Sequence, residues 1–600
     1  MTTPTRTALA ALVVGSLTAC QPPAPADGAS TDGPNYDILI TGGRIVDGTG
    51  NPWFYGDVAI RDRRIARITP PGMLASANAP TRIDATGKVV APGFIDIQAH
   101  STGAFTSGDG RVVSTVTQGI TTAILGEGST PAPTNDRTLA EAGAPSPGRD
   151  SVLNRFRGAR GFGTWLETME SNGISQNVGS FLGAATPRVY AKGEAIGAPT
   201  PTELDTMRAV VRNAMEDGAF GIASALIYPP ANFATTEELI ELAKASAPLG
   251  GVYITHMRSE ADRLLEAIDE ALQIGKEGGV PVEIYHLKAS GNRNWAKMPL
   301  AIAKIDSARK AGQDVAADMY LYTAGGTGLA ACTPPWASAD GKLLDNLRDP
   351  ATRQRIKDEM LRPQANSEGL CELMGPEGVQ VVGFRSDALQ RYEGQRLSAI
   401  ARQMGKHWAD ALFDIVLEEQ GRVGAIFHMM TEANLPLQIR QPWIKWGTDA
   451  GGMDPDSATG VLAHPRAYGN YPRLLGRYVR EQGVISLEEA IRKGTSAVAN
   501  RLSIRDRGVL RERAYADVIV FDPTTVIDRA TFEQPHQLSV GIEHVLVNGT
   551  AVVTDGKHTG AKPGIVVRGP GWAATGDPRD ERPGASRRDR PKQVYSSSAT

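Results

Sequence analysis

Five places in this 600-residue sequence carry polar side chains directly after a short apolar run, and together they could bind a metal ion. The side chains are Gln98 with His100, Glu127, His256, His286 and Asp449. Imidazole and carboxylate groups are ligands for divalent metals such as zinc. A lone histidine after a strand is more often a hydrogen-bonded structural residue, but five such places together favour a shared site.

The pair Gln98 and His100 departs from the pattern of a metal-binding strand end. Residues two apart face the same side of a strand, so two histidines at these positions would supply half of a metal site. The first of them is an amide, which is a poor ligand for zinc. From these residues alone, the site has either been altered and kept, or been lost.

Short strands alternate with helices in the middle of the chain. Strand-like runs cover 121–125, 220–224, 252–255, 282–285 and 444–447, and capping boxes start helices after Thr200, Thr235 and Ser486. The alternation predicts an α/β fold, with residues 91–499 as a (β/α)8 TIM-like barrel whose catalytic groups follow the strands. The segment at about 324–374 fits this rhythm poorly and is predicted to be an insertion over the barrel mouth.

Both ends of the chain contain short alternating segments that are typical of antiparallel strands. They cover 36–45 and 57–68 near the start, and 516–521, 544–547 and 551–553 near the end, where Asn548-Gly549 is a hairpin turn. We therefore expect a small β-sandwich domain built from residues 35–90 and 500–570, with the barrel inserted between its halves. A chain of this length is too long for one core.

The two termini are predicted to lie outside these domains. Residues 1–20 have the pattern of a signal peptide that ends in Leu17-Thr18-Ala19-Cys20, similar to a bacterial lipobox. This predicts lipidation of Cys20 and a place in the bacterial cell envelope, at the outer membrane facing the periplasm, since Gln21 follows; a plain secretory signal is the alternative. Residues 21–34 are predicted to be a flexible linker and 571–600 a disordered tail.

The net charge bears on nucleic-acid binding, and the cysteine content bears on disulfide formation. A formal net charge of -3 gives no electrostatic case for binding nucleic acid. After Cys20, only Cys332 and Cys371 remain, and a disulfide between them is as plausible as two separate buried thiols.

The sequence resembles the amidohydrolase superfamily, and within it the D-aminoacylase (N-acyl-D-amino-acid deacylase) family. The resemblance covers residues 36–569 and rests on these stretches: APGFIDIQAHS, THMRSE at His256, YHLKASG at His286, GTDAGG at Asp449, HPRAYGNYPR at 464–473, and DRGVLRERAYADVIVFDP with DRATFEQPHQLSVGIEHVLVNG. The stretch at 464–473 and the closing stretch, made of the last two fragments, are long and specific to the D-aminoacylase branch.

The resemblance implies a metal site. His256 and His286 keep the thirty-residue spacing of the family's two histidine ligands. The family's third ligand is a cysteine in a Gly-Asn-Cys-Gly turn, where this chain has Gly126-Glu127-Gly128-Ser129, so Glu127 either replaces it or is only a solvated turn residue.

The family's second, weaker metal position uses a His-x-His pair and the aspartate. With Gln98 in place of the first histidine, we expect that position to be empty or weak, with His100 a weak ligand or a residue that orients the water. The expected cofactor is one divalent metal ion, with Zn²⁺ the leading candidate.

The resemblance also implies roles in the reaction. Asp449 is expected to be the general base, which takes a proton from metal-bound water and passes it to the leaving amine; otherwise it only caps a turn. Lys288 and Arg466 match positions that bind the free carboxylate of the substrate. Tyr228 is expected to face the scissile carbonyl and Tyr322 to line the pocket, although either could be a core aromatic.

The predicted function is therefore a metal-dependent amidohydrolase that cleaves small N-acyl amino acids, with the D configuration favoured, to a carboxylate and a free amino acid. The alternative within the superfamily is a dipeptidase or another amide hydrolase. An inactive envelope protein that binds ligands is a third hypothesis, suggested by the missing histidine and cysteine. Against it, Asp449, His256 and His286 all stand in their family contexts.

Overall fold

The computed structural model describes residues 35–141, 147–363, 368–456, 458 and 462–572. The predicted signal peptide with Cys20, the predicted linker and the chain beyond residue 572 lie outside these residues. Within the described residues, no helix has both the length and the apolar composition to cross a bilayer.

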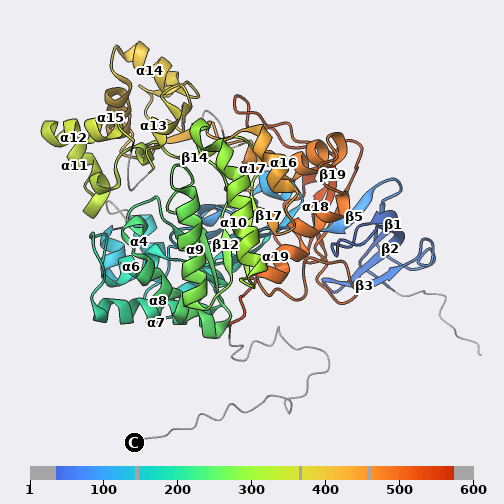
Figure 1. The fold of residues 1–600 in the computed structure, drawn as a ribbon. Coiled ribbons are helices and arrows are strands. Elements are labelled where there is room, and N and C mark those ends of the chain that lie inside the picture. The colour runs from blue at the N-terminus through green and yellow to red at the C-terminus, as the bar shows by residue number, and fades with distance from the viewer. Residues whose placement is uncertain (1–34, 142–146, 364–367, 457, 459–461, 573–600) are drawn as a thin grey trace, which may run out of the picture.

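Two parallel sheets form the centre of an α/β fold (Figure 1). One has six strands in the order β17–β13–β12–β11–β10–β9, and the other has the order β6–β7–β8. Only Phe181 separates β8 from β9, and a parallel bridge between Ala99 and Ala450 joins the residues after β6 to those after β17. The strands are β6 (Phe94–Asp96), β7 (Ile120–Leu125), β8 (Asn177–Ser180), β9 (Leu182–Gly183), β10 (Gly221–Ala225), β11 (Val252–His256), β12 (Val282–Ile284), β13 (Val315–Met319) and β17 (Ile444–Trp446).

Helices connect these strands, and three of them begin where the sequence predicts. The side chain of Thr200 accepts a hydrogen bond from the backbone of Glu203 in a complete capping box, and Thr235 and Ser486 cap their helices with the same bond. The helices are α1 (Thr102–Thr106), α2 (Val113–Val116), α3 (Asp136–Glu141), α4 (Pro147–Asn154), α5 (Gly161–Ser171), α6 (Ala185–Ala191), α7 (Pro201–Asp217), α8 (Thr236–Ser246), α9 (Leu264–Gly278), α10 (Met298–Lys310), α16 (Leu435–Ile439), α17 (Arg466–Arg473), α18 (Leu487–Gly494) and α19 (Ser496–Arg501).

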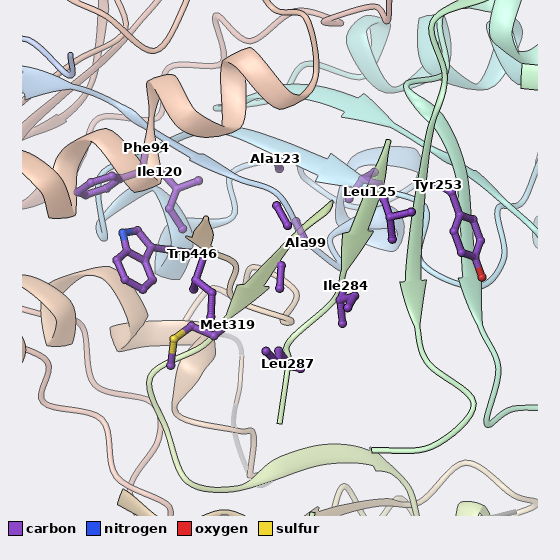
Figure 2. Packing of buried hydrophobic residues seen from close by; sticks show 14 of the residues in the cluster. Phe94, Ala99, Ile120, Ala123, Leu125, Tyr253, Ile284, Leu287, Met319 and Trp446 are labelled. Carbon is purple, nitrogen blue, oxygen red and sulfur yellow. The ribbon is translucent and has the colours of Figure 1, made fainter. Parts of the chain in front are cut away.

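The main hydrophobic core lies among these strands and their helices. Phe94, Ile120, Ile284 and Trp446, from four different strands, are fully buried and belong to one cluster, which Figure 2 shows from close by. Because apolar side chains from distant segments fill this interior, the core fixes where each strand ends. The ends of the strands in turn determine where the polar residues that follow them lie.

The two ends of the described chain meet in one nine-stranded sheet. Strand β5 from the first part pairs with β18 from the last part, so that Val90 lies opposite Val520. The structure therefore shows one sheet shared by both ends, whereas a separate second layer of a sandwich stays a prediction. The strands are β1 (Ile38–Ile45), β2 (Phe54–Arg61), β3 (Arg64–Thr69), β4 (Thr81–Asp84), β5 (Val89–Pro92), β18 (Val518–Phe521), β19 (Ile542–Val547), β20 (Thr550–Thr554) and β21 (Lys557–His558).

The predicted insertion is longer than its expected end at residue 374. It begins at β14 as expected but continues to the end of β16, because β16 is the middle strand of a small antiparallel sheet and pairs with both β14 and β15. This unit, yellow in Figure 1, has its own hydrophobic core. Its elements are β14 (Gly325–Gly328), α11 (Leu343–Arg348), α12 (Pro350–Met360), α13 (Leu370–Met374), β15 (Val379–Val382), α14 (Leu397–Met404), α15 (Trp408–Glu418) and β16 (Gly424–Phe427).

The two cysteines in the described chain form a disulfide within this unit. The Sγ atoms of Cys332 and Cys371 are 2.05 Å apart, and both residues belong to its core. Of the two alternatives that the sequence leaves open, the structure shows the bonded one.

Candidate metal centre and active site

A cavity of about 530 Å³ lies at the carboxyl ends of the parallel strands. It brings together predicted site residues that are far apart in the sequence. Its lining includes His100, Glu127, Tyr228, His256, His286, Lys288, Asp449 and Arg466. These residues follow or end several different elements, as the fold requires of a site at the ends of parallel strands.

The backbone turns sharply where these residues leave the strands. Gly126, between β7 and Glu127, has φ +112°, and a Cβ there would lie 2.3 Å from the carbonyl oxygen of Phe181. His286 and Asp449 also have positive φ, of 32° and 50°. Residues other than glycine rarely adopt a positive φ, and those that do are concentrated at functional sites.

Glu127, His256 and His286 converge into a group that could hold a metal ion. Glu127 Oε1 lies 3.3 Å from His256 Nδ1 and 3.5 Å from His286 Nε2. The ligand atoms of the three residues lie within 4.8 Å of one another. The two imidazole rings are nearly perpendicular, at 88°, with centroids 4.5 Å apart. The structure therefore places Glu127 beside both histidines rather than in a solvated turn.

Glu260 holds the outer side of both histidines. Its carboxylate lies 2.9 Å from His286 Nδ1 and 3.5 Å from His256 Nε2, the ring nitrogens that do not approach Glu127. A histidine that binds a metal usually donates its other N–H to such a carboxylate, which fixes the tautomer and the ring orientation. Sequence reasoning missed Glu260, although it ends the THMRSE stretch four residues after His256.

Gln98 stands where the second, weaker metal position would need a histidine ligand, and it directs a hydrogen-bond donor at Glu127. Its Nε2 donates to Glu127 Oε2 over 2.5 Å, and its buried Oε1 has no hydrogen-bond partner among the described residues. His100 Nε2 lies 3.0 Å from Asp449 Oδ1 and 3.2 Å from Glu127 Oε2. The group His100, Glu127 and Asp449 therefore shares Glu127 with the first ligand set.

The charges of the site shift the pKa values of its members strongly. Burial disfavours the charged form of His286, and Lys288 adds to this, but the surrounding carboxylates outweigh both and raise the pKa of His286 to about 10. Burial raises the pKa of Asp449, but Arg466 and His286 outweigh it and lower that pKa to about 2. Asp449 is therefore ionised at neutral pH and able to accept a proton.

This arrangement fits a divalent metal. Two imidazoles and one carboxylate are a suitable donor set for zinc, and each histidine turns one nitrogen toward Glu127. The other nitrogen faces the carboxylate of Glu260, at 2.9 Å in His286 and at 3.5 Å in His256. The raised pKa of His286 indicates that the carboxylates around it favour positive charge at this place. Glu127, His256 and His286 are the residues that would hold the metal.

Two cations line the cavity next to its carboxylates, and one of them, Lys288, has its Nζ 2.7 Å from His286 Nδ1. Arg466 Nη1 lies 2.8 Å from Asp449 Oδ2, and Lys288 Nζ lies 2.7 and 2.8 Å from the two carboxylate oxygens of Glu260. The Nε of Arg466 is buried and has no hydrogen-bond partner in the described part of the chain. Both cations therefore have a carboxylate partner, but Arg466 keeps a free donor, Nε, for a ligand.

The prediction that Tyr322 lines the pocket is wrong. Its hydroxyl donates to Asp528 over 2.9 Å and its ring packs against Phe532, away from the cavity lining. Tyr320 lines the cavity instead, and its buried hydroxyl has no partner among the described residues. Both tyrosines follow β13 and are two residues apart, so strand alternation would put them on the same side and could not have distinguished them. Tyr228, by contrast, lines the cavity with its ring 5.5 Å from that of His256.

Comparison with known proteins finds relatives along nearly the whole chain. Residues 440–553 match the model of the amidohydrolase family. The D-aminoacylase of Alcaligenes xylosoxydans xylosoxydans is 33% identical over 543 residues, which cover 90% of this chain and 99% of that protein.

Two solved structures have a similar fold. The N-acyl-D-glutamate deacylase of Bordetella bronchiseptica, complexed with zinc and a phosphonate inhibitor that mimics the tetrahedral intermediate, is 31% identical with a TM-score of 0.71. A D-aminoacylase described by its binuclear metal centre, with one-metal activation and second-metal attenuation, is 31% identical with a TM-score of 0.72. Each comparison covers 89% of this chain and 100% of the other. This chain belongs to the amidohydrolase family, in its D-aminoacylase branch.

Proposed function

We propose that this protein is a metal-dependent hydrolase that cleaves N-acyl amino acids, with the D configuration favoured, to a carboxylate and a free amino acid. The observation that carries the proposal is the convergence of Glu127, His256 and His286 beside the ionised Asp449 in one cavity. The relatives named above act on N-acyl-D-amino acids or bind zinc, which supports the same chemistry.

The residues of the cavity divide the work of amide hydrolysis. When bound, the metal polarises the amide carbonyl and makes an attacking water more acidic. The carboxylate of Asp449 takes the proton of that water and delivers it to the nitrogen of the leaving amine, so that the C–N bond breaks and the proton balance closes. Tyr228, beside His256, is placed to face the carbonyl group.

The carboxylate of the substrate is proposed to bind at Arg466 and Tyr320. The guanidinium of Arg466 lies over the Tyr320 ring at 4.4 Å, and both side chains retain a buried polar group without a hydrogen-bond partner among the described residues. A guanidinium suits a carboxylate because it can donate two parallel hydrogen bonds. Lys288 contributes positive charge from behind Tyr320, with its Nζ 5.7 Å from the ring centroid.

We propose that the site holds one metal ion, with zinc the preferred candidate. The hydrogen bond from Gln98 uses the oxygen of Glu127 that faces the second ligand group, and an amide nitrogen cannot serve as a ligand there. Only His100, Glu127 and Asp449 remain for a second ion among the described residues, and Asp449 is already paired with Arg466.

Two wider features of the chain belong to the same proposal. The order of the parallel strands, the short step from β8 to β9 and the bridge from Ala99 to Ala450 support a closed (β/α)8 barrel. The lipobox-like sequence before Cys20 supports lipid anchoring in the bacterial envelope, and loss of fatty-acid labelling in Cys20→Ser would test it.

The decisive experiment combines metal analysis with a substrate screen. The purified protein, reconstituted with zinc, cobalt or manganese, is expected to bind about one ion per chain and to hydrolyse N-acyl-D-amino acids. Glu127→Ala should lose the metal, whereas the control Glu512→Ala, at a carboxylate that is about half exposed, should keep it. Neither metal nor hydrolysis in the wild-type protein would reject the proposal, and full metal content in Glu127→Ala would reject Glu127 as a ligand.

A further inference from the structure

The strongly exposed aromatic side chains of the described residues all lie at one place on the surface. Trp53, Phe54 and Tyr55 are 38%, 43% and 57% exposed, and they follow one another where β2 begins. Every other tryptophan, phenylalanine and tyrosine of the described chain is buried or only partly exposed. Single exposed apolar side chains are normal on a protein surface, whereas a contiguous apolar patch marks a contact surface.

An arginine lies beside these rings. The rings of Trp53 and Tyr55 meet edge to face with centroids 5.1 Å apart, and the guanidinium of Arg44 lies over the Trp53 ring at 5.2 Å. Arg44 stands opposite Tyr55 in the pairing of β1 with β2, so the sheet fixes the cation next to the rings. We call Arg44 with Trp53, Phe54 and Tyr55 the aromatic tip.

The chemistry of the aromatic tip suits the headgroup layer of a bilayer. Tryptophan and tyrosine are enriched at membrane–water interfaces, because the ring is apolar while its N–H or O–H stays hydrated. A guanidinium binds phosphate oxygens through paired hydrogen bonds, and phospholipid headgroups carry such oxygens. Arg44 over Trp53 therefore combines an apolar anchor with a phosphate-binding cation.

The aromatic tip lies at the other end of β6 from the candidate metal centre. In the loop that leads to the tip, a Cβ on Gly48 would lie 2.7 Å from Cγ of Pro92, and β6 begins two residues later at Phe94. The cavity is at the carboxyl end of β6, and no residue of the tip lines it. The tip is also remote from the inserted unit (Figure 1). A surface that binds the tip therefore leaves the cavity open to solution.

The start of the chain supplies a reason for a bilayer rather than a protein partner. The predicted lipidation site, Cys20, is separated from Asn35, the first described residue, by residues 21–34. A segment of this length can span up to about 50 Å. The strand that leads from Asn35 to Ile45, beside the tip, covers at most about 33 Å. A bilayer that holds the lipid can therefore also reach the tip, and stable membrane attachment usually needs a second contact besides the lipid.

We propose that the aromatic tip docks on the phospholipid bilayer in which the chain is anchored, with its rings at the level of the headgroups. The tip then supplies a second contact beside the lipid and orients the protein with the cavity away from the membrane. This inference rests on the lipid anchoring proposed for Cys20, and it is independent of the hydrolase activity.

Tryptophan fluorescence tests the inference on the full-length protein. The protein is mixed with vesicles of phosphatidylethanolamine and phosphatidylglycerol that carry brominated acyl chains, which quench tryptophans that enter the bilayer. We expect a quenched component in the wild-type protein that disappears in Trp53→Phe. It should remain in the control Trp336→Phe, which removes a tryptophan packed against the core of the inserted unit. Wild-type protein that binds the vesicles without this component, or does not bind them, would overturn the proposal.

Removing the three rings should weaken membrane binding without affecting catalysis. In Trp53→Ser/Phe54→Ser/Tyr55→Ser, we expect the affinity for the same vesicles to fall by at least about 10-fold. The kcat/KM for a soluble N-acetyl-D-amino acid should stay at the wild-type value, because these residues lie outside the cavity lining. The matched control removes three exposed apolar side chains elsewhere: Ile196→Ser/Leu300→Ser/Leu361→Ser. Equal vesicle affinity of the two triple variants would contradict the proposal.

A second copy of this chain is the competing occupant of the tip. If the wild-type protein sediments as a dimer without vesicles and the tip variant sediments as a monomer, the tip binds another copy and the membrane proposal is wrong. Activity and vesicle binding are measured on the same preparation. Hydrolysis without contact between the tip and the bilayer would thus reject the tip alone, and failure of the hydrolase function is recognised separately.

Discussion

Glu260 and Lys288 form a buried ion pair directly behind His256 and His286, the two histidines of the candidate metal centre. Lys288 Nζ lies within 2.8 Å of both carboxylate oxygens, and the two side chains are each 4% exposed. The same carboxylate contacts the outer nitrogens of His256 and His286. Glu260 therefore links the orientation of His256 and His286 to the buried charge of Lys288.

Replacing Glu260 by glutamine should weaken both the metal site and the fold. We expect Glu260→Gln to bind zinc about 10- to 100-fold less tightly, because the amide has no negative charge and keeps only one of the two acceptor oxygens that face the histidines. Lys288 is then a buried charge without a counter-ion, which costs about 3–5 kcal/mol of unfolding free energy. Competition with a chelator measures the first effect and denaturant unfolding of the metal-free protein the second.

A surface carboxylate provides the control for this variant. Glu512 pairs with Arg67 over 3.4 Å, and both side chains are more than half exposed. Glu512→Gln should change the unfolding free energy by less than about 1 kcal/mol and leave zinc affinity unaltered. If Glu260→Gln behaved like this control, Glu260 would have no positioning role.

Replacing Asp449 should separate catalysis from metal binding. Asp449→Asn keeps the shape of the side chain but removes the base, so we expect kcat to fall by about 10²- to 10⁴-fold. The metal content should stay the same, because Glu127, His256 and His286 are untouched. Steady-state kinetics with elemental analysis on one preparation checks both statements. An unaltered kcat would exclude Asp449 as the base.

Asp96 should make stability depend on pH below neutrality. Burial is the main reason that its pKa rises from 3.8 to about 7 in the folded protein, although bonds from Thr448 and Gln98 oppose this. Between these two pH values the folded state keeps a proton that the unfolded state has released. The contribution of Asp96 is therefore fully present below pH 3.8, is lost as the pH rises toward 7, and is constant above that.

The variant Asp96→Asn has no titratable group at this position, so its unfolding free energy is the reference for that of the wild-type protein. The unfolding free energy of the wild-type protein relative to the variant should fall by at most about 1.4 kcal/mol per pH unit across the window. Denaturant unfolding of both metal-free proteins between about pH 4 and pH 8 measures the difference, where metal affinity contributes nothing. A difference that is constant with pH would mean that Asp96 is ionised in the folded protein.

The disulfide should stabilise the inserted unit. Cys332 and Cys371 are 39 residues apart in the sequence, and closing a loop of this size contributes about 3–4 kcal/mol by restricting the unfolded chain. We expect Cys332→Ser/Cys371→Ser to lose about this much unfolding free energy, and reductant to affect the wild-type protein in the same way while leaving the double variant unaltered. Equal stability of the two oxidised proteins would contradict a stabilising role.

Local sequence determined where the reactive side chains lie along the chain. His256, His286 and Asp449 could be chosen because each follows an apolar run, and parallel strands bring their carboxyl ends to one edge. Helix starts such as Thr200 were equally predictable, since a capping box involves only residues three apart. These features depend on neighbours in the sequence, so the sequence shows them.

Tertiary structure alone decided the features that depend on distant partners. Tyr322 leaves the cavity because its hydroxyl bonds Asp528, 206 residues later, and Tyr320 takes its place. The insertion extends to β16 because that strand pairs with β14, about a hundred residues earlier in the chain. That Gln98 donates its hydrogen bond to Oε2 of Glu127 could not be known from the sequence around either residue. Chain pattern sets which groups are available, and packing between remote segments sets which of them meet.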